Sequence, residues 1–223
     1  MADKAKEDIR LAERLSREEY FESETFSGED LQGANLGDKE FYRCVFENCQ
    51  FHESLWKGVT MEACAFRGCN VTRAQVANAK FRDVRFENSK LMGIDWSDVS
   101  SNPDLHFEDC GLSYCSFVGL NLRKLKFLRC VVREANFFDS DLTDSEFDGS
   151  DFGGSNFHGC NLNRADFSGA SGVFLDPARN TLKDTRVPLE SAIDLARTLG
   201  MLVVGYHDDV KKRVGRKDRG ARQ

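Results

Sequence analysis

Cysteine and histidine are the residues of this chain that could bind a metal or act as a nucleophile and its base. The chain has eight cysteines and four histidines, and several cysteines follow one another with C-x4-C spacing, as Cys44 and Cys49 do. Zinc sites are usually built from C-x2-C pairs with histidines nearby, and a catalytic cysteine needs a base beside it. None of the histidines stands in that relation to a cysteine or serine. The sequence therefore predicts neither a metal site nor nucleophilic catalysis.

Carboxylates are the other groups that could do chemistry, as general acids and bases. The chain contains 37 acidic and 31 basic residues, for a formal net charge of −6. On an acidic, solvated surface, neighbouring carboxylates are weak evidence for acid–base catalysis. No glycine-rich phosphate loop follows a strand and opens a helix. We therefore expect no catalytic residue, no enzyme activity and no cofactor.

The elements that position these residues are indicated by a five-residue period. Every fifth residue is apolar from Phe21 to Trp96 and again, displaced by one residue, from Phe107 to Phe167. Side chains five apart in a helix are rotated by about 140°, and in a strand they point to opposite faces. Only a backbone that turns a corner every few residues can bury all of them. The period therefore predicts a solenoid.

A second inner position lies two residues before each apolar one and mostly holds a small side chain. A large and a small residue facing the same interior fill it densely without strain. Free cysteine behaves as a small buried hydrophobe, so we interpret the cysteines as core residues and their spacing as a consequence of the period. All eight cysteines occupy this position: Cys44, Cys49, Cys64, Cys69, Cys110, Cys115, Cys130 and Cys160.

The repeating units resemble those of a known family. Segments such as Ala34-Asn35-Leu36 and Ala165-Asp166-Phe167 are similar to the A(N/D)(L/F)xx consensus of pentapeptide repeat proteins. The resemblance covers residues 19–175. It implies an all-β solenoid, a right-handed quadrilateral β-helix with four five-residue sides and about seven coils. Residues 1–18 precede it as a charged arm or short helix.

The repeat is interrupted between Trp96 and Phe107, where the chain must cover two units with one residue to spare. Pro103 lies within this stretch and cannot donate a hydrogen bond to a β-ladder. We expect a bulge or short projecting loop around Asn102, Pro103 and Asp104, with the coil continuing in the same sense. In quinolone-resistance relatives such loops contribute to protection, so the resemblance makes this one a candidate contact.

The residue pattern of the segment 176–206 predicts a helix followed by a strand. Pro188 suits the first helical position, apolar residues then recur at helical spacing, Gly200 suits the C-cap, and residues 201–204 favour a strand. This segment would cap the last coil, and it also resembles the one through which quinolone-resistance proteins dimerise. Both roles can hold. The dimerisation candidates are Leu195, Leu199, Met201, Leu202 and Val204.

Charge is distributed unevenly along the chain. The repeat region is acidic, whereas residues 207–223 are basic and predict a disordered, solvated tail. The side of the solenoid built on Leu36, Trp56, Val76, Trp96, Phe117, Phe137 and Phe157 is the least basic. Five aspartates lie on or beside it, and they are our candidate partner-binding residues: Asp95, Asp98, Asp139, Asp141 and Asp144.

Two functions are consistent with these features. The whole layout resembles the quinolone-resistance and the albicidin- and microcin-immunity proteins of the family. That resemblance implies a DNA mimic that binds DNA gyrase, with topoisomerase IV as a further candidate, and protects it from a poison. An acidic rod about as wide as a duplex could occupy a DNA-binding groove, because DNA carries one charge per about 1.7 Å of its axis. The alternative is an interaction scaffold with an unrelated partner.

A basic band in the second half departs from a uniformly acidic mimic. Its members are Arg123, Lys124, Lys126, Arg129 and Arg133. We expect no direct binding of nucleic acid. The N-terminus lacks the apolar core of a signal peptide, and no apolar run approaches the ~20 residues that span a bilayer. We therefore expect a cytoplasmic protein without a membrane segment.

Overall fold

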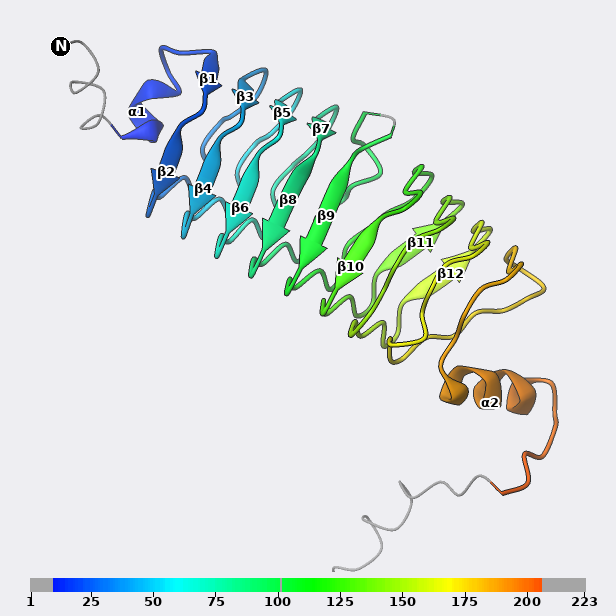
Figure 1. The fold of residues 1–223 in the computed structure, drawn as a ribbon. Helices are drawn as coiled ribbons and strands as arrows, with labels where there is room; N and C mark the ends of the chain where they lie inside the picture. The colour runs from blue at the N-terminus through cyan, green and yellow to red at the C-terminus, as the bar shows by residue number, and fades with distance from the viewer. Residues whose placement is uncertain (1–9, 101, 206–223) are drawn as a thin grey trace, which may run out of the picture.

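The computed structural model describes residues 10–100 and 102–205 as a solenoid of stacked coils (Figure 1). Most of the expected N-terminal arm and the basic tail 207–223 lie outside the described residues. The strands are short because the chain turns a corner after each five-residue unit. They are β1 Tyr20–Glu22, β2 Thr25–Ser27, β3 Glu40–Tyr42, β4 Val45–Glu47, β5 Thr60–Glu62, β6 Ala65–Arg67, β7 Lys80–Arg82, β8 Val84–Glu87, β9 Leu105–Glu108, β10 Lys126–Leu128, β11 Asn136–Phe138 and β12 Asn156–His158.

Strands of successive coils pair in parallel and form the sides of the solenoid. One sheet has the order β1-β3-β5-β7, a second β10-β9-β8-β6-β4-β2, and β11 pairs with β12. The register is twenty residues, so Phe46 faces Phe66 and Phe66 faces Phe86. Isolated bridges continue the ladder between these strands. The predicted parallel β-solenoid is confirmed.

The apolar residues of the period form continuous columns inside the coils. Phe46 and Phe66 stack with ring centroids 4.6 Å apart, and Phe137 and Phe157 with centroids 4.8 Å apart. Adjacent columns meet edge to face, as Phe46 and Phe51 do. Stacked and edge-to-face rings add to the burial of apolar area, so each coil is held mainly by its neighbours.

The small inner position provides a hydrogen-bond donor as well as space. Cys49 Sγ donates to the carbonyl of Phe26 at 3.4 Å, and Ser150 Oγ donates to that of Phe127 at 2.9 Å. All eight cysteines are buried and free, as predicted. Burial raises the pKa of Cys115 to about 11, which keeps that thiol protonated and unreactive at neutral pH.

The interrupted stretch makes the expected excursion, visible as the wider turn beyond β7 in Figure 1. The register increases by one residue across it, since β8 places Phe86 opposite Phe107. Asn102 has a φ of 61°, a left-handed conformation that asparagine tolerates. Pro103 is buried, whereas Asn102 and Asp104 are exposed. The coil continues beyond the break.

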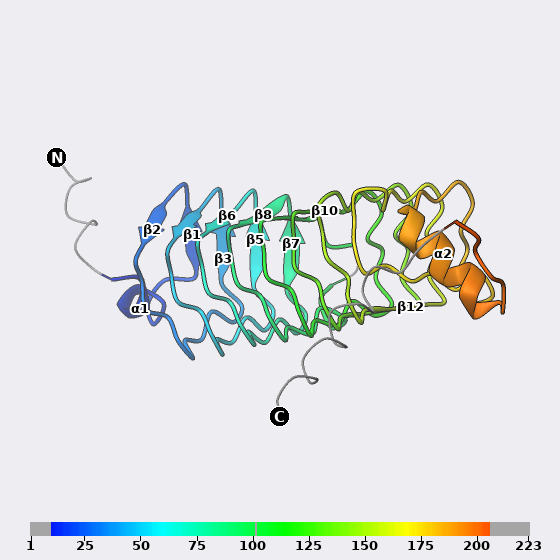
Figure 2. The same cartoon turned by 90° about the horizontal axis from the view of Figure 1, so that it is seen from below.

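Helices lie at the two ends of the solenoid (Figure 2). The helix α1, Leu11–Arg14, covers the first coil with Leu11 and with Arg14, whose guanidinium lies 5.0 Å from the ring centroid of Phe21. The helix α2, Leu189–Thr198, is attached at the other end by Ser191, which donates to the carbonyl of Val173 at 2.6 Å.

The C-terminal segment differs from the expectation in two respects. The ladder passes residue 175, since Asn161 pairs with Thr181 and Asp166 with Arg186. Residues 201–204, predicted as a strand, do not form one in the structure, since they pair with no strand among the described residues.

The end of α2 itself is as predicted. Gly200 has a φ of 77° and donates to Arg197, and Met201 donates to Ala196, both at 2.9 Å. This pair of bonds is the Schellman motif that closes a helix at glycine. Pro188 is the N-cap of the helix and precedes its first helical residue.

Candidate partner-binding surface

Outward-facing residues form columns along the solenoid, because positions twenty apart lie on neighbouring coils. Arg67 lies between Glu47 and Glu87, with N–O distances of 3.5 and 3.2 Å. Arg129 contacts Glu108 and Asp109, both of which lie on the preceding coil. On these columns a cation therefore stands one coil away from an anion and offsets its charge.

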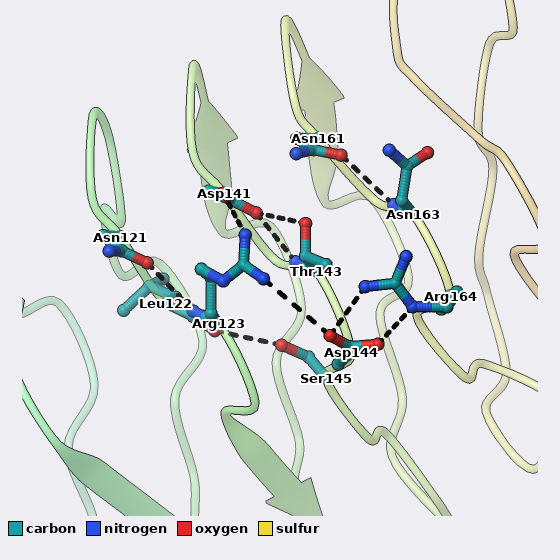
Figure 3. A network of polar contacts seen from close by, with 10 residues as sticks. All are labelled: Asn121, Leu122, Arg123, Asp141, Thr143, Asp144, Ser145, Asn161, Asn163 and Arg164. Carbon is teal, nitrogen blue, oxygen red and sulfur yellow. Dashed lines mark hydrogen bonds and ion pairs between the residues drawn. The ribbon is translucent and has the colours of Figure 1, made fainter.

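The network around Asp144 shows this pairing in detail (Figure 3). Arg164 holds Asp144 with two hydrogen bonds, Nε to Oδ1 at 2.6 Å and Nη2 to Oδ2 at 2.8 Å. Arg123 reaches Asp141 at 3.4 Å and Asp144 at 4.0 Å. The backbone N–H of Thr143 donates to Asp141 Oδ1 at 2.9 Å. The two carboxylates are thus bound to two guanidinium groups.

These contacts favour the ionised carboxylates. The hydrogen bonds from Arg164 lower the pKa of Asp144 below its ordinary value. Partial burial raises the pKa of Asp141, but hydrogen bonds from Thr143 and the charge of Arg123 outweigh it, and the pKa is lowered overall. Both groups are charged at neutral pH, yet their field is largely cancelled by the adjacent arginines.

The side built on Leu36, Trp56, Val76, Trp96, Phe117, Phe137 and Phe157, with the residues flanking them, is called the Trp face below. Its carboxylates Asp38, Asp95, Asp98 and Asp139 are exposed, and the last three belong to the predicted partner-binding set. Asp95 accepts a hydrogen bond from the backbone N–H of Ser97 at 3.1 Å. None of the three makes an ion pair with any residue that the structure describes. Their negative charge is therefore free to act on a partner.

The five predicted aspartates thus divide into two groups. Asp95, Asp98 and Asp139 lie on the Trp face without a described cation, whereas Asp141 and Asp144 lie around the corner between Arg123 and Arg164. Asp141 and Asp144 are not the unpaired acidic groups that the low basicity of the Trp face suggested. The reason is the twenty-residue spacing, which places Arg123 of the basic band on the coil before them and Arg164 on the coil after them.

The dimerisation candidates are mostly exposed in the single chain. Leu199 and Met201 are 63% and 56% exposed, and Leu202 and Val204 are 95% and 96% exposed. Leu195 is half-buried. Ile193 of α2 is buried, as is Ser191, which bonds to Val173 at the end of the solenoid. The helix therefore attaches through one side and leaves an apolar surface uncovered.

Two aromatic residues that the sequence analysis did not select are also exposed. Phe138 is 38% and Phe174 is 42% exposed, although the inner phenylalanines are all buried. Together with His158, Asp176 and Arg179 they line a groove of about 370 Å³. A signal existed in the sequence: Phe138 follows Phe137, at a position where the repeat places polar residues.

A larger groove of about 510 Å³ lies on the side of the solenoid that precedes the Trp face in each coil. Met92 and Tyr114 provide its apolar surface and Arg73 and Lys90 its cations. Arg73 is 3.6 Å from Glu53, so part of this charge is offset. This groove belongs to the side built on Phe51, Val71, Leu91 and Leu112, whose flanking residues line it.

Possible metal ligands, the histidines and the helices complete the description of the residues that the structure places. No three His, Cys, Asp or Glu residues within it are placed to hold a metal ion. Of the histidines, His158 is exposed and His106 is 3.4 Å from Asp104. The Nδ1 atom of His52 is buried without a described hydrogen-bond partner. No helix among the described residues is long and apolar enough to cross a membrane.

Comparison with known proteins agrees with this architecture. The chain matches the model of the pentapeptide repeat region over residues 39–102 and 103–172. It is 29% identical to Protein McbG of Escherichia coli over 175 residues, which cover 78% of this chain and 94% of McbG. The structure superposes on a trypsin-treated variant of QnrB1, a plasmid-mediated fluoroquinolone resistance protein, with a TM-score of 0.64 and 21% identity, covering 83% of this chain and 90% of QnrB1. The chain belongs to the pentapeptide repeat family.

Proposed function

We propose that this protein binds DNA gyrase through the Trp face, as a mimic of DNA, and protects the enzyme from a poison. The outcome would be antibiotic resistance or self-immunity. The similarity to McbG along nearly the whole of that protein, and the fold shared with a fluoroquinolone resistance protein, support this class of function. Topoisomerase IV is a further candidate target.

The observation that carries the proposal is the set of unpaired carboxylates on the Trp face. A surface that binds DNA presents a positive field, and unpaired anions are attracted to such a field over about a Debye length, some 8–10 Å in ordinary salt. Asp95, Asp98 and Asp139 can contribute to this attraction because no described cation cancels them. The exposed Asn102 and Asp104 of the loop are additional contact candidates.

The test removes those three charges and no others. We predict that the variant Asp95→Asn, Asp98→Asn, Asp139→Asn binds gyrase at least tenfold more weakly and no longer rescues supercoiling from a fluoroquinolone. Asparagine is the right replacement because Asp139 has a φ of 54°, which asparagine tolerates. Wild-type binding should also weaken as salt rises, since exposed charges are screened.

A matched control removes three exposed carboxylates from other sides. The variant Glu40→Gln, Asp148→Asn, Asp184→Asn changes the net charge equally, and none of these groups makes a described ion pair. We expect it to protect gyrase as the wild type does. If the Trp-face variant folds and still protects, charge mimicry is wrong, and the scaffold function becomes the better one.

We also propose that a second copy covers the apolar C-terminal surface. A partner strand would satisfy the backbone of residues 201–204, which pair with no strand among the described residues. We predict that Leu202→Asp yields a monomer with an unchanged fold, because Leu202 is 95% exposed in the single chain but would carry a charge into an apolar contact. Light scattering at micromolar concentration measures this, with Met92→Asp as control. A monomeric wild type would contradict the dimer.

A further inference from the structure

The groove between Phe138 and Phe174 lies on the Trp face, beside one of its free carboxylates. Phe138 ends β11 and its ring meets the imidazole of His158 on β12 edge to face, with centroids 5.9 Å apart. Asp139 is the next residue of the chain. An apolar hollow and an unpaired anion are therefore adjacent on the same side of the solenoid.

The groove exists because the coil after β12 leaves the regular pattern. Gly172 and Pro177 stand twenty residues after Phe152 and Phe157, where the inner columns would continue. No described residue pairs with Asn156 from the following coil, although Asn156 pairs with Asn136 on the preceding one. The segment that replaces the regular coil carries Phe174, which lines the hollow and is 42% exposed.

The exposure of these two rings is not needed for the fold. The same place in the repeat is not occupied by phenylalanine on the other coils of the Trp face, which carry Gly37, Lys57, Ala77, Ser97, Val118 and His158. A surface aromatic with a pocket beside it is a common anchor of protein–protein contacts, where a buried apolar group provides affinity and nearby charges provide orientation. Within the groove Asp176 is paired with Arg179 at 3.3 Å, and the adjacent Asp139 has no described cation. The unpaired charge beside the groove is therefore negative, which makes a nucleic acid a poor occupant.

We propose that the groove receives an apolar side chain from a basic segment of the topoisomerase that the Trp face binds. This inference rests on the proposed function and adds to it. The basic residues of that segment would meet Asp95, Asp98 and Asp139, and the apolar one would insert between Phe138 and Phe174. Recognition then combines a screened electrostatic attraction with an apolar anchor that salt does not weaken. DNA itself has no equivalent of this anchor.

The test measures how salt changes the binding of gyrase to variants of the full-length protein. We expect Phe138→Ser, Phe174→Ser to weaken binding about tenfold at both 50 and 200 mM salt, with the same salt dependence as the wild type. The triple Asp→Asn variant should instead reduce the salt dependence. Met92→Ser is the matched control, because Met92 is 39% exposed and lines the other groove. It should bind as the wild type does.

The possible results separate this inference from the proposed function. In the first case the wild type binds gyrase, the triple Asp→Asn variant binds more weakly, and the Phe138→Ser, Phe174→Ser variant binds normally. The inferred apolar anchor is then wrong, and the proposed function stands. If the wild type does not bind gyrase, the proposed function fails and the anchor fails with it. If the Phe variant loses self-association while retaining gyrase binding, the groove is a contact between copies, which also overturns the anchor. Circular dichroism of each variant verifies that the solenoid has formed.

Discussion

The Trp face and the neighbouring side that carries Asp141 and Asp144 differ in whether their carboxylates are paired with cations. On the neighbouring side, Asp144 is bound by Arg164 on the next coil and approached by Arg123 on the previous one. On the Trp face, Asp139 has no described cation within reach. Both sides carry aspartates, yet only the Trp face presents their charge to a partner. In a solenoid, the residue twenty positions away decides whether a surface charge is free.

The largest effect is expected when the Trp face is made to resemble its neighbour. Ser116 pairs with Asp95 on the adjacent coil, so Ser116→Arg would place a guanidinium beside that carboxylate. We predict a roughly tenfold loss of gyrase affinity, since the new cation both pairs with Asp95 and repels a basic surface. Binding measured by interferometry at low salt tests this. Ser116→Gln is the control for side-chain size, and an equal loss with glutamine would contradict the electrostatic explanation.

A smaller effect is expected from the reverse change on the neighbouring side. Arg123→Gln with Arg164→Gln would leave Asp141 and Asp144 unpaired. If the partner contacts the Trp face alone, gyrase affinity should stay within about twofold, because the freed carboxylates would act on it only through a salt-screened field and would not touch it. The melting temperature should decrease only slightly, since exposed ion pairs contribute little to stability. A large gain or loss of affinity would show that the partner also contacts the side that carries Asp141 and Asp144.

The smallest effect concerns pH. Hydrogen bonds from arginine lower the pKa values of Asp109, Asp144 and Asp151 in the folded protein. Because an unfolded aspartate has a pKa of about 3.9, their stabilising contribution is fully present above that pH and is lost as the pH falls through the lower folded values. We predict that the melting temperature decreases below about pH 4.

The Arg164→Gln variant tests how much the Asp144–Arg164 pair contributes to this decrease of the melting temperature at low pH. Removing the arginine abolishes the hydrogen bonds that lower the pKa of Asp144. Thermal melts between pH 2 and pH 6 should therefore show a slightly shallower acid loss in the variant than in the wild type. Identical acid limbs would mean that the Asp144–Arg164 pair does not contribute to stability.

Much of the interior could be predicted from the sequence because each residue's environment follows from its place in the period. The inner column through Phe46, Phe66 and Phe86, and the burial of every cysteine, needed only the five-residue spacing. The excursion before Phe107 followed from the single extra residue. These features depend on local contacts between neighbouring coils, which the repeat specifies directly.

The surface was harder to predict because it depends on which coils face each other. The ladder continues to Arg186 because Leu182 and Val187 keep the twenty-residue spacing through a coil that Gly172 and Pro177 make irregular. The five-residue pattern stops there, so the boundary at residue 175 was placed too early. The pairing of Asp141 with Arg123, and the hollow beside Phe138, likewise involve residues from separate coils.

By itself, the sequence determined the solenoid, its core columns and the helix that ends at Gly200, since periodicity and capping chemistry act over short stretches of chain. Only the tertiary structure decided which carboxylates are paired, where the two phenylalanines remain exposed, and that residues 201–204 form no strand within one chain. The physical reason is the same in each case. Charge pairing, grooves and strand pairing depend on groups brought together from different coils or from another chain, and such distances exist only once the coils have stacked.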